Sequence, residues 1–230
     1  MFKIQNILLL NKIKYNLKIN LLILILFFLR LTLQNYSNEI SKTKTSKLTS
    51  QIILVIKKKL YFYEKIDDNW NEIFSTDCNI GKNGMIPEEE HFEGQGKTPI
   101  GSFPILYAFG TKPMHDLNIY YRRITPYSYC VDDSTDMQIY NSWVESEIKL
   151  KCEHLIEYQM PYELSFYIGF NVKNKVKDRG SCVFLHMFSE KDYTEGCVAI
   201  SKDMMYKLIH IIKNYAYIII IENESQILNY

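Results

Sequence analysis

Short apolar runs separated by polar turns dominate the chain from Gln51 onward. These runs have the length and the β-branched or aromatic content of buried strands. The triplets Lys-Lys-Lys at 57–59 and Asp-Asp-Asn at 67–69 separate the first three runs and have the polar character of turns. The pattern predicts strands over 52–56, 60–66, 70–80, 165–171, 182–188, 198–200 and 217–221. A β-rich domain that begins with strand–turn–strand units is therefore expected.

One helix is predicted near the end of this domain. Ser201 is a good N-cap residue and Asp203 suits a first helical turn. Apolar side chains then recur at helical spacing, at Met204, Met205, Leu208, Ile209 and Ile212. The pattern indicates an amphipathic helix over 202–214 whose methionines pack in the core.

The chain before the domain has a different composition. Residues 1–37 contain five basic side chains and no acidic one, and the stretch 21–29 is wholly apolar. This is the pattern of a signal peptide or a retained N-terminal anchor, although a buried apolar helix of the fold is an alternative. The polar stretch 38–50 is expected to be a linker, 51–222 one domain, and 223–230 a tail.

The net charge of +1 comes from the basic leader, so the rest of the chain is mildly acidic. A mildly acidic body argues against nucleic-acid binding, which requires a basic face. Nucleotide binding is also not expected, because the segment from Gly94 to Thr98 matches a P-loop only in part.

Candidate chemistry is concentrated between Gly180 and Ser201. His186 is the one ionisable group of an apolar run, and the sequence Thr194-x-Gly196-Cys197 follows a polar loop. A strand, a loop and a second strand would bring the imidazole and the thiol to the same end of a sheet. Nucleophilic attack by cysteine needs this pair, because the imidazole takes the thiol proton. Gly196 permits a backbone shape that a Cβ atom would forbid.

This stretch resembles the catalytic domain of the L,D-transpeptidase (YkuD-type) family, in which a histidine, a loop and Ser/Thr-x-Gly-Cys recur. The segment 94–103 is similar to the family's Gly-x-Thr-Pro-x-Gly-x-Phe block. Two further blocks resemble one branch of the family, namely Val131-Asp132-Asp133 with Tyr140-Asn141-x-Trp143, and Phe184-Leu185-His186. All four blocks occur in the family's order, and the resemblance covers Gln51 to Glu222.

The chain departs from the commoner form of the family at three places. The gap from His186 to Cys197 is eleven positions, which is short. Glu195 replaces a usual histidine, and Ala199 stands where many members have arginine or asparagine. The short loop and the Gly-Cys-Val-Ala sequence are typical of the branch named above.

The resemblance implies a β-rich, YkuD-like sandwich of mixed sheets with one or more short helices, forming one catalytic domain. It implies that Cys197 attacks a peptidoglycan stem peptide to form a thioester, which an amine acceptor resolves. His186 would be the general base, oriented by the backbone carbonyl of Met187. The N–H groups of Gly196 and Cys197 would form the oxyanion hole, and Thr194 belongs to the same motif. No cofactor or metal is expected, and the enzyme would be exported to the periplasm or cell envelope.

Three other functions are alternatives to acyl transfer to an amine. An L,D-carboxypeptidase would resolve the thioester with water, and a non-catalytic wall-binding module would use only the fold. A papain-like protease is disfavoured because its cysteine precedes its histidine.

The remaining candidate ligands and thiols give weaker signals. The acidic triplet 88–90 is expected to be a solvated loop, and His91 has no partner at metal-ligand spacing. In an exported chain Cys78, Cys130, Cys152 and Cys182 can form two disulfides while Cys197 stays free. For Cys182 core packing is favoured over a disulfide or a second active-site thiol.

Overall fold

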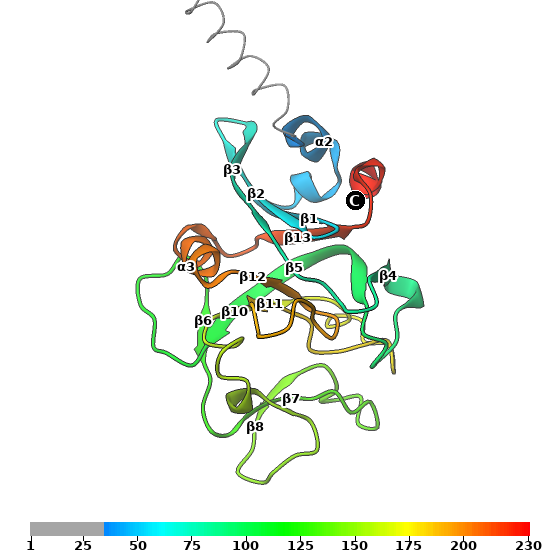
Figure 1. The fold of residues 1–230 in the computed structure, drawn as a ribbon, viewed down its shortest axis with the longest axis vertical. Coiled ribbons are helices and arrows are strands. Elements are labelled where there is room, and N and C mark those ends of the chain that lie inside the picture. Colours follow the sequence, from blue (N-terminus) through cyan, green and yellow to red (C-terminus); the bar gives the residue numbers. More distant parts are fainter. Residues whose placement is uncertain (1–34) are drawn as a thin grey trace, which may run out of the picture. The chain divides into compact units, whose positions relative to one another are not determined.

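A long strand, β5 (Thr98–Gly110), lies at the centre of the computed structural model, which describes residues 35–230 (Figure 1). Its first half pairs with β13 and its second half with β10. The strand order β12-β11-β10-β5-β13-β1-β2-β3 therefore forms one curled mixed sheet, with β4 and β6 as further partners of β5. The expected β-rich, YkuD-like fold of mixed sheets with a few short helices is confirmed.

The other elements have the following bounds. The strands are β1 Gln51–Ile56, β2 Lys59–Ile66, β3 Asn69–Asp77, β4 Met85–Pro87, β6 Tyr121–Arg123, β7 Ser128–Cys130, β8 Trp143–Glu145, β9 Glu153–His154, β10 Ser165–Ile168, β11 Phe184–Met187, β12 Val198–Ile200 and β13 Tyr217–Ile221. The helices are α2 Ser37–Lys42, α3 Lys202–Ile211 and the 3-10 turns η1 Thr45–Lys47, η2 Glu88–Glu90, η3 Leu155–Glu157 and η4 Glu224–Asn229.

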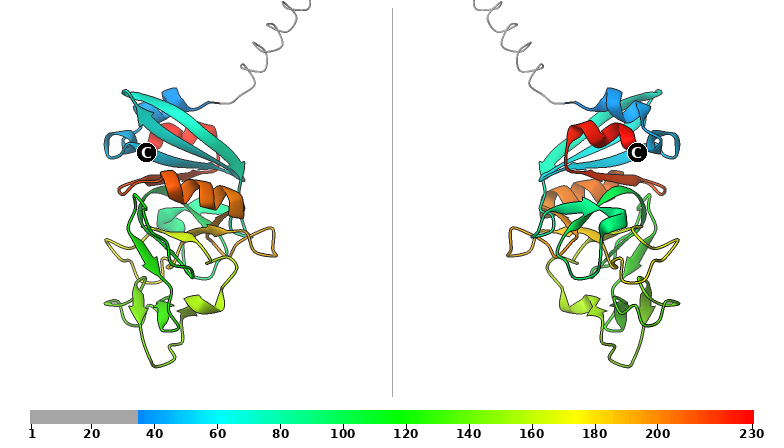
Figure 2. Two further views of the ribbon diagram at one scale, coloured as in Figure 1. Left: turned by 90° about the vertical axis from the view of Figure 1, so that its left-hand side faces the viewer. Right: turned by 90° about the vertical axis from the view of Figure 1, so that its right-hand side faces the viewer.

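The core lies on both faces of β1 and its parallel neighbour β13. All six residues of β1 are buried, because helices cover both of its faces (Figure 2). On one face Ile53, Val55 and Ile218 pack with the apolar side of α3. On the opposite face lie α2 and η4. A near-continuous apolar run is what a strand covered on both sides requires.

The segment expected to be a linker is part of this fold. Residues 37–42 form α2, and its Ile40 side chain is fully buried. The hydroxyl of Thr45 hydrogen-bonds to that of Ser102 in β5 at 2.7 Å. The expected tail is also ordered as η4, with Ile227 buried. Single apolar residues anchor both segments, so neither shows the periodicity by which the other elements could be recognised.

The predicted signal peptide or anchor lies almost wholly outside the described residues. Within residues 35–230 no helix is long and apolar enough to cross a membrane.

The predicted helix is present as α3, which begins at the expected residue and ends earlier. The Ser201 hydroxyl accepts a hydrogen bond from the Met204 N–H. The helix ends at Ile211 because Ile212 has an extended backbone, although its side chain remains in the core. Met205 is fully buried and Met204 packs against the core, as expected for core methionines.

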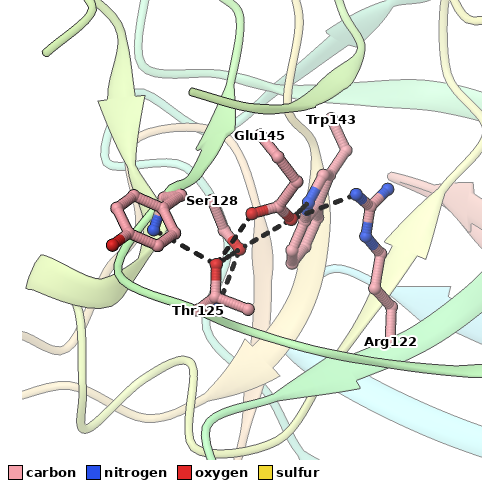
Figure 3. Close-up of polar contacts among 6 residues, drawn as sticks. Arg122, Thr125, Ser128, Trp143 and Glu145 are labelled. Carbon is pink, nitrogen blue, oxygen red and sulfur yellow. Dashed lines mark hydrogen bonds and ion pairs between the residues drawn. The ribbon is translucent and has the colours of Figure 1, made fainter. Parts of the chain in front are cut away.

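A small sheet, β8-β7-β9, lies beside the main sheet (Figure 1). The Glu145 carboxylate at the end of β8 accepts hydrogen bonds from Thr125, Ser128, Trp143 and Arg122 (Figure 3). The Arg122 guanidinium also lies 4.5 Å above the Trp143 ring. Since Arg122 belongs to β6, which pairs with β5, this polar cluster fixes the small sheet to the main one.

One disulfide joins the small sheet to the segment before β11. Cys130 is bonded to Cys182, whereas Cys78 and Cys152 are free thiols. Cys182 is therefore a disulfide half, the alternative to the favoured core packing, although its side chain also lies in a buried core cluster, and the possible second disulfide is not formed. The side-chain alternation of a strand does not apply at Cys182, because its φ is 51° and β11 begins only at Phe184.

We predict that Ile40→Ala lowers the free energy of unfolding by about 2 to 4 kcal/mol, because a fully buried side chain leaves a cavity. Urea denaturation measures this change. Leu48→Ala is the matched control in the same segment, since that side chain is 62% exposed, and it should stay within about 0.5 kcal/mol of the parent. Equal, negligible effects of both substitutions would show that the segment does not contribute to the domain.

Candidate active site

The register of β11 and β12 places the candidate thiol and imidazole on one face. The two strands are parallel, with Leu185 opposite Val198 and His186 opposite Ala199. Extending the register by one residue puts Cys197 opposite Phe184, on the same face as His186. The loop after β11 returns to the start of β12, so the thiol comes just before a strand and the imidazole lies within one. Both side chains line a cavity of about 890 Å³.

The Cys197 thiol rests on the backbone of the segment before β11. Its Sγ accepts a hydrogen bond from the Phe184 N–H at 3.2 Å and donates to the Cys182 carbonyl at 3.6 Å. Burial, and then the charge of Glu153, raises the pKa of the Cys197 thiol to about 12, although the Phe184 N–H lowers it. Cys197 at rest is therefore a protonated thiol.

The His186 ring is fixed by its own strand. The side chain is 7% exposed, and its Nδ1 lies 2.7 Å from the Met187 carbonyl. This carbonyl can only accept, so Nδ1 carries the proton and Nε2 keeps its lone pair. Burial lowers the pKa of His186 to about 4, because the Met187 hydrogen bond raises it only in part. A neutral imidazole with a free Nε2 lone pair is able to receive a proton from a thiol.

Two threonines hold the carbonyl of Cys197. The Thr194 hydroxyl donates to this oxygen at 2.6 Å, and the Thr98 hydroxyl at 3.2 Å. Thr98 is the first residue of β5, so the Thr-Pro-x-Gly block contacts the backbone of Cys197 directly. The Gly81 N–H in turn donates to the Thr98 hydroxyl at 2.8 Å. The carbonyl of Cys197 is thus tied to the central strand.

Gly196 has a backbone that disfavours any side chain. Its φ is +149°, and an added Cβ would lie 3.0 Å from the Lys97 carbonyl. Its N–H donates to the Thr194 hydroxyl at 3.2 Å. The Gly196 N–H was expected to help form the oxyanion hole. In this structure it is already hydrogen-bonded to Thr194.

Several residues that contact the site carry no motif signal in the sequence. Tyr162 lies edge-on to His186, with 5.7 Å between ring centroids, and its hydroxyl donates to the Glu153 carboxylate. Burial raises the pKa of Glu153 to about 7, although the Tyr162 hydrogen bond lowers it. Glu153 and Tyr162 come from a stretch without clear periodicity, so only the fold reveals that they meet the Cys–His pair.

Other candidate ligands have structural roles in the fold. Both ring nitrogens of His91 are bonded to carbonyls, of Arg179 at 2.6 Å and of Lys97 at 2.8 Å. The Asp133 carboxylate caps the N–H of Thr135 at 2.9 Å, whereas Asp132 lines the cavity. Across residues 35–230 there is no group of three His, Cys, Asp or Glu side chains that could hold a metal ion.

The chain is similar to known proteins over most of its length. A family model described as the L,D-transpeptidase catalytic domain (YkuD) matches residues 50–220. Comparison with curated proteins gave no match.

Solved structures also resemble the chain. Bd1075 of Bdellovibrio bacteriovorus is 17% identical, with 81% of this chain and 55% of that one covered and a TM-score of 0.42. The helical cell shape determining protein Pgp2 of Campylobacter jejuni is 16% identical, with coverages of 76% and 48% and a TM-score of 0.47. An L,D-transpeptidase mutant of Enterococcus faecium is 12% identical, with coverages of 75% and 50% and a TM-score of 0.39. The chain spans about half the length of these structures.

The lowered pKa of His186 predicts acid sensitivity. The unfolded chain binds this proton below about pH 6.5 and the folded chain only below about pH 4. Stability is therefore lost as the pH falls through this window, by about 2 to 3 kcal/mol between about pH 7.5 and about pH 4.5. Urea denaturation at both pH values measures the loss. His186→Asn should remove this part of the pH dependence, and equal acid sensitivity of both proteins would contradict the assignment.

The charge of Glu153 predicts slower reaction of Cys197. Glu153→Gln removes a negative charge that opposes thiolate formation, so iodoacetamide should alkylate Cys197 about 2- to 5-fold faster at about pH 8. Peptide mass spectrometry reports the rate at this cysteine.

The effect should fade near pH 5.5, where Glu153 is itself protonated. Glu190→Gln, an exposed acid on the same cavity, is the control and should leave the rate unchanged. An equal acceleration by both variants would indicate a nonspecific charge effect.

Proposed function

Because the chain belongs to the L,D-transpeptidase (YkuD) catalytic domain family, we propose that it is a cysteine-dependent acyltransferase acting on peptidoglycan stem peptides. The observation that carries this proposal is the placement of Cys197 and His186 on one face of β11 and β12, in the wall of one cavity. Its partners are a stem peptide and an amine acceptor, and its place of action is the periplasm or cell envelope. The basic, apolar leader of residues 1–37 supports export.

In the first half of the reaction Cys197 Sγ turns from the Cys182 carbonyl towards the substrate and attacks an amide carbon. His186 Nε2 takes the thiol proton as the S–C bond forms, so the high thiol pKa is overcome during attack. The Cys197 N–H is the remaining candidate donor for the oxyanion, since Gly196 donates to Thr194. The imidazolium then protonates the leaving amine as the C–N bond breaks, and a thioester remains.

In the second half an acceptor amine attacks the thioester. His186 Nε2 removes the proton of the amine, the C–S bond breaks, and Cys197 regains its proton from the imidazolium. Water in place of the amine would make the same site an L,D-carboxypeptidase.

We predict that a carbapenem acylates the protein once, at Cys197. Intact-mass analysis should show a one-to-one adduct with the parent and none with Cys197→Ala. His186→Ala should slow acylation by about 100-fold or more, because it removes the general base.

An adduct that persists in Cys197→Ala would place the nucleophile elsewhere. The absence of any adduct on the folded protein with Cys197 reduced would favour the non-catalytic wall-binding module. A tetrapeptide donor with a labelled D-amino acid acceptor then separates the two enzymatic outcomes. Incorporated label indicates transfer, and shortened peptide without label indicates hydrolysis.

A further inference from the structure

We propose that the Cys130–Cys182 disulfide positions the Cys197 thiol, so that acyl transfer requires this disulfide to be intact. The proposal rests on the function proposed above, with Cys197 as nucleophile. It assigns the disulfide a role in the reaction beyond holding the fold together.

Both hydrogen bonds of the Cys197 sulfur are made with the backbone of residues 182–184. The carbonyl that accepts from Cys197 Sγ belongs to Cys182 itself, and the N–H that donates to it belongs to Phe184, two residues later. The position of the sulfur therefore depends on where the backbone of residues 182–184 lies. A displacement of this segment would move both contacts at once.

The backbone before β11 has few regular hydrogen bonds of its own, apart from the Ile168 N–H, which donates to the Val183 carbonyl at 3.0 Å. Residues 169–183, between β10 and β11, form turns and no strand or helix. Cys182 has a φ of 51°, which is unfavourable for a residue with a Cβ atom. The Cys182 N–H donates to the Asn141 carboxamide at 2.9 Å, and the disulfide is its covalent anchor.

The other end of the disulfide, Cys130, is held by the fold. Cys130 ends β7, and its sulfur lies 3.4 Å from the hydroxyl of Tyr167 in β10. That hydroxyl also donates to the side chain of Asn141 at 3.0 Å. The Glu145 cluster secures the neighbouring strand β8 (Figure 3). A fixed Cys130 can therefore hold Cys182 in place.

The consequence is a link between activity and redox compartment. A dithiol reduces the disulfide by thiol–disulfide exchange: the S–S bond breaks, two thiols form, and the dithiol becomes a cyclic disulfide. In a reducing cytoplasm Cys182 would lose its covalent anchor and keep only hydrogen bonds to the rest of the fold, and the enzyme would stay inactive until export into an oxidising compartment.

The test is the acylation of Cys197 by a carbapenem, followed by intact mass. All five cysteines lie in the described residues, and two of them form the single disulfide while three are free thiols, so dithiothreitol has one target. The full chain is reduced, desalted without oxygen, and compared with oxidised protein over a range of carbapenem concentrations. We expect the maximal acylation rate to fall about 10-fold or more and the half-saturating concentration to stay unchanged. Reoxidation should restore the rate.

The double variant Cys130→Ala with Cys182→Ala is the control. It should be slow and insensitive to dithiothreitol. Near-ultraviolet circular dichroism and a melting curve on the same samples establish that the reduced protein is folded at the assay temperature. If the double variant does not fold, the reduction series on the parent decides.

Two results would overturn the proposal. A reduced, folded protein that is acylated at the oxidised rate would show that the disulfide does not position the thiol. A loss of acylation that coincides with global unfolding would show that the disulfide only stabilises the fold. If the oxidised parent is not acylated at all, the proposed function itself fails, and this inference fails with it.

Discussion

The backbone hydrogen bonding of β5 is the constraint on which the rest of the structure depends. Its first half completes the sheet of β13, β1, β2 and β3, and its second half begins the sheet of β10, β11 and β12. The same strand begins at Thr98, whose hydroxyl reaches the Cys197 carbonyl. Packing of the core and placement of the Cys197 backbone are therefore set by one element, and the Thr98-Pro99-x-Gly101 block forms the start of that strand.

Burial determines the protonation of the reactive pair. It raises the pKa of the Cys197 thiol and lowers that of the His186 imidazole, so both groups are neutral at rest. Because the thiol is protonated at rest, little thiolate is present to react with other electrophiles. In the proposed reaction, proton transfer must therefore accompany attack, which requires substrate to align the thiol with Nε2.

Sequence reasoning identified the parts of the site that are local in the chain. A single strand–loop–strand unit contains His186, Thr194, Gly196 and Cys197. The short spacing between them places them close together in space. The Cys130–Cys182 bond and the Glu153–Tyr162 pair depend on how separate segments fold against each other. The α2 segment was missed for a related reason, because Ile40 is one buried side chain in a polar stretch. Hydrophobic periodicity marks strands and helices in a sequence, and neither the disulfide, the Glu153–Tyr162 pair nor α2 produces such a pattern.

The departures from the commoner family motif lie away from the reacting atoms. Glu195 is mostly exposed and pairs with Lys82 at 2.6 Å on the surface. Ala199 is buried in β12 opposite His186, and its backbone exchanges two hydrogen bonds with Asn79. The sulfur of Cys197 is hydrogen-bonded to Phe184 and Cys182, and the ring of His186 to Met187, so neither Glu195 nor Ala199 is among these partners. These positions therefore alter the rim and the support of the cavity, whereas the thiol, the imidazole and the threonine clamp on the Cys197 carbonyl are kept together by β5, β11 and β12.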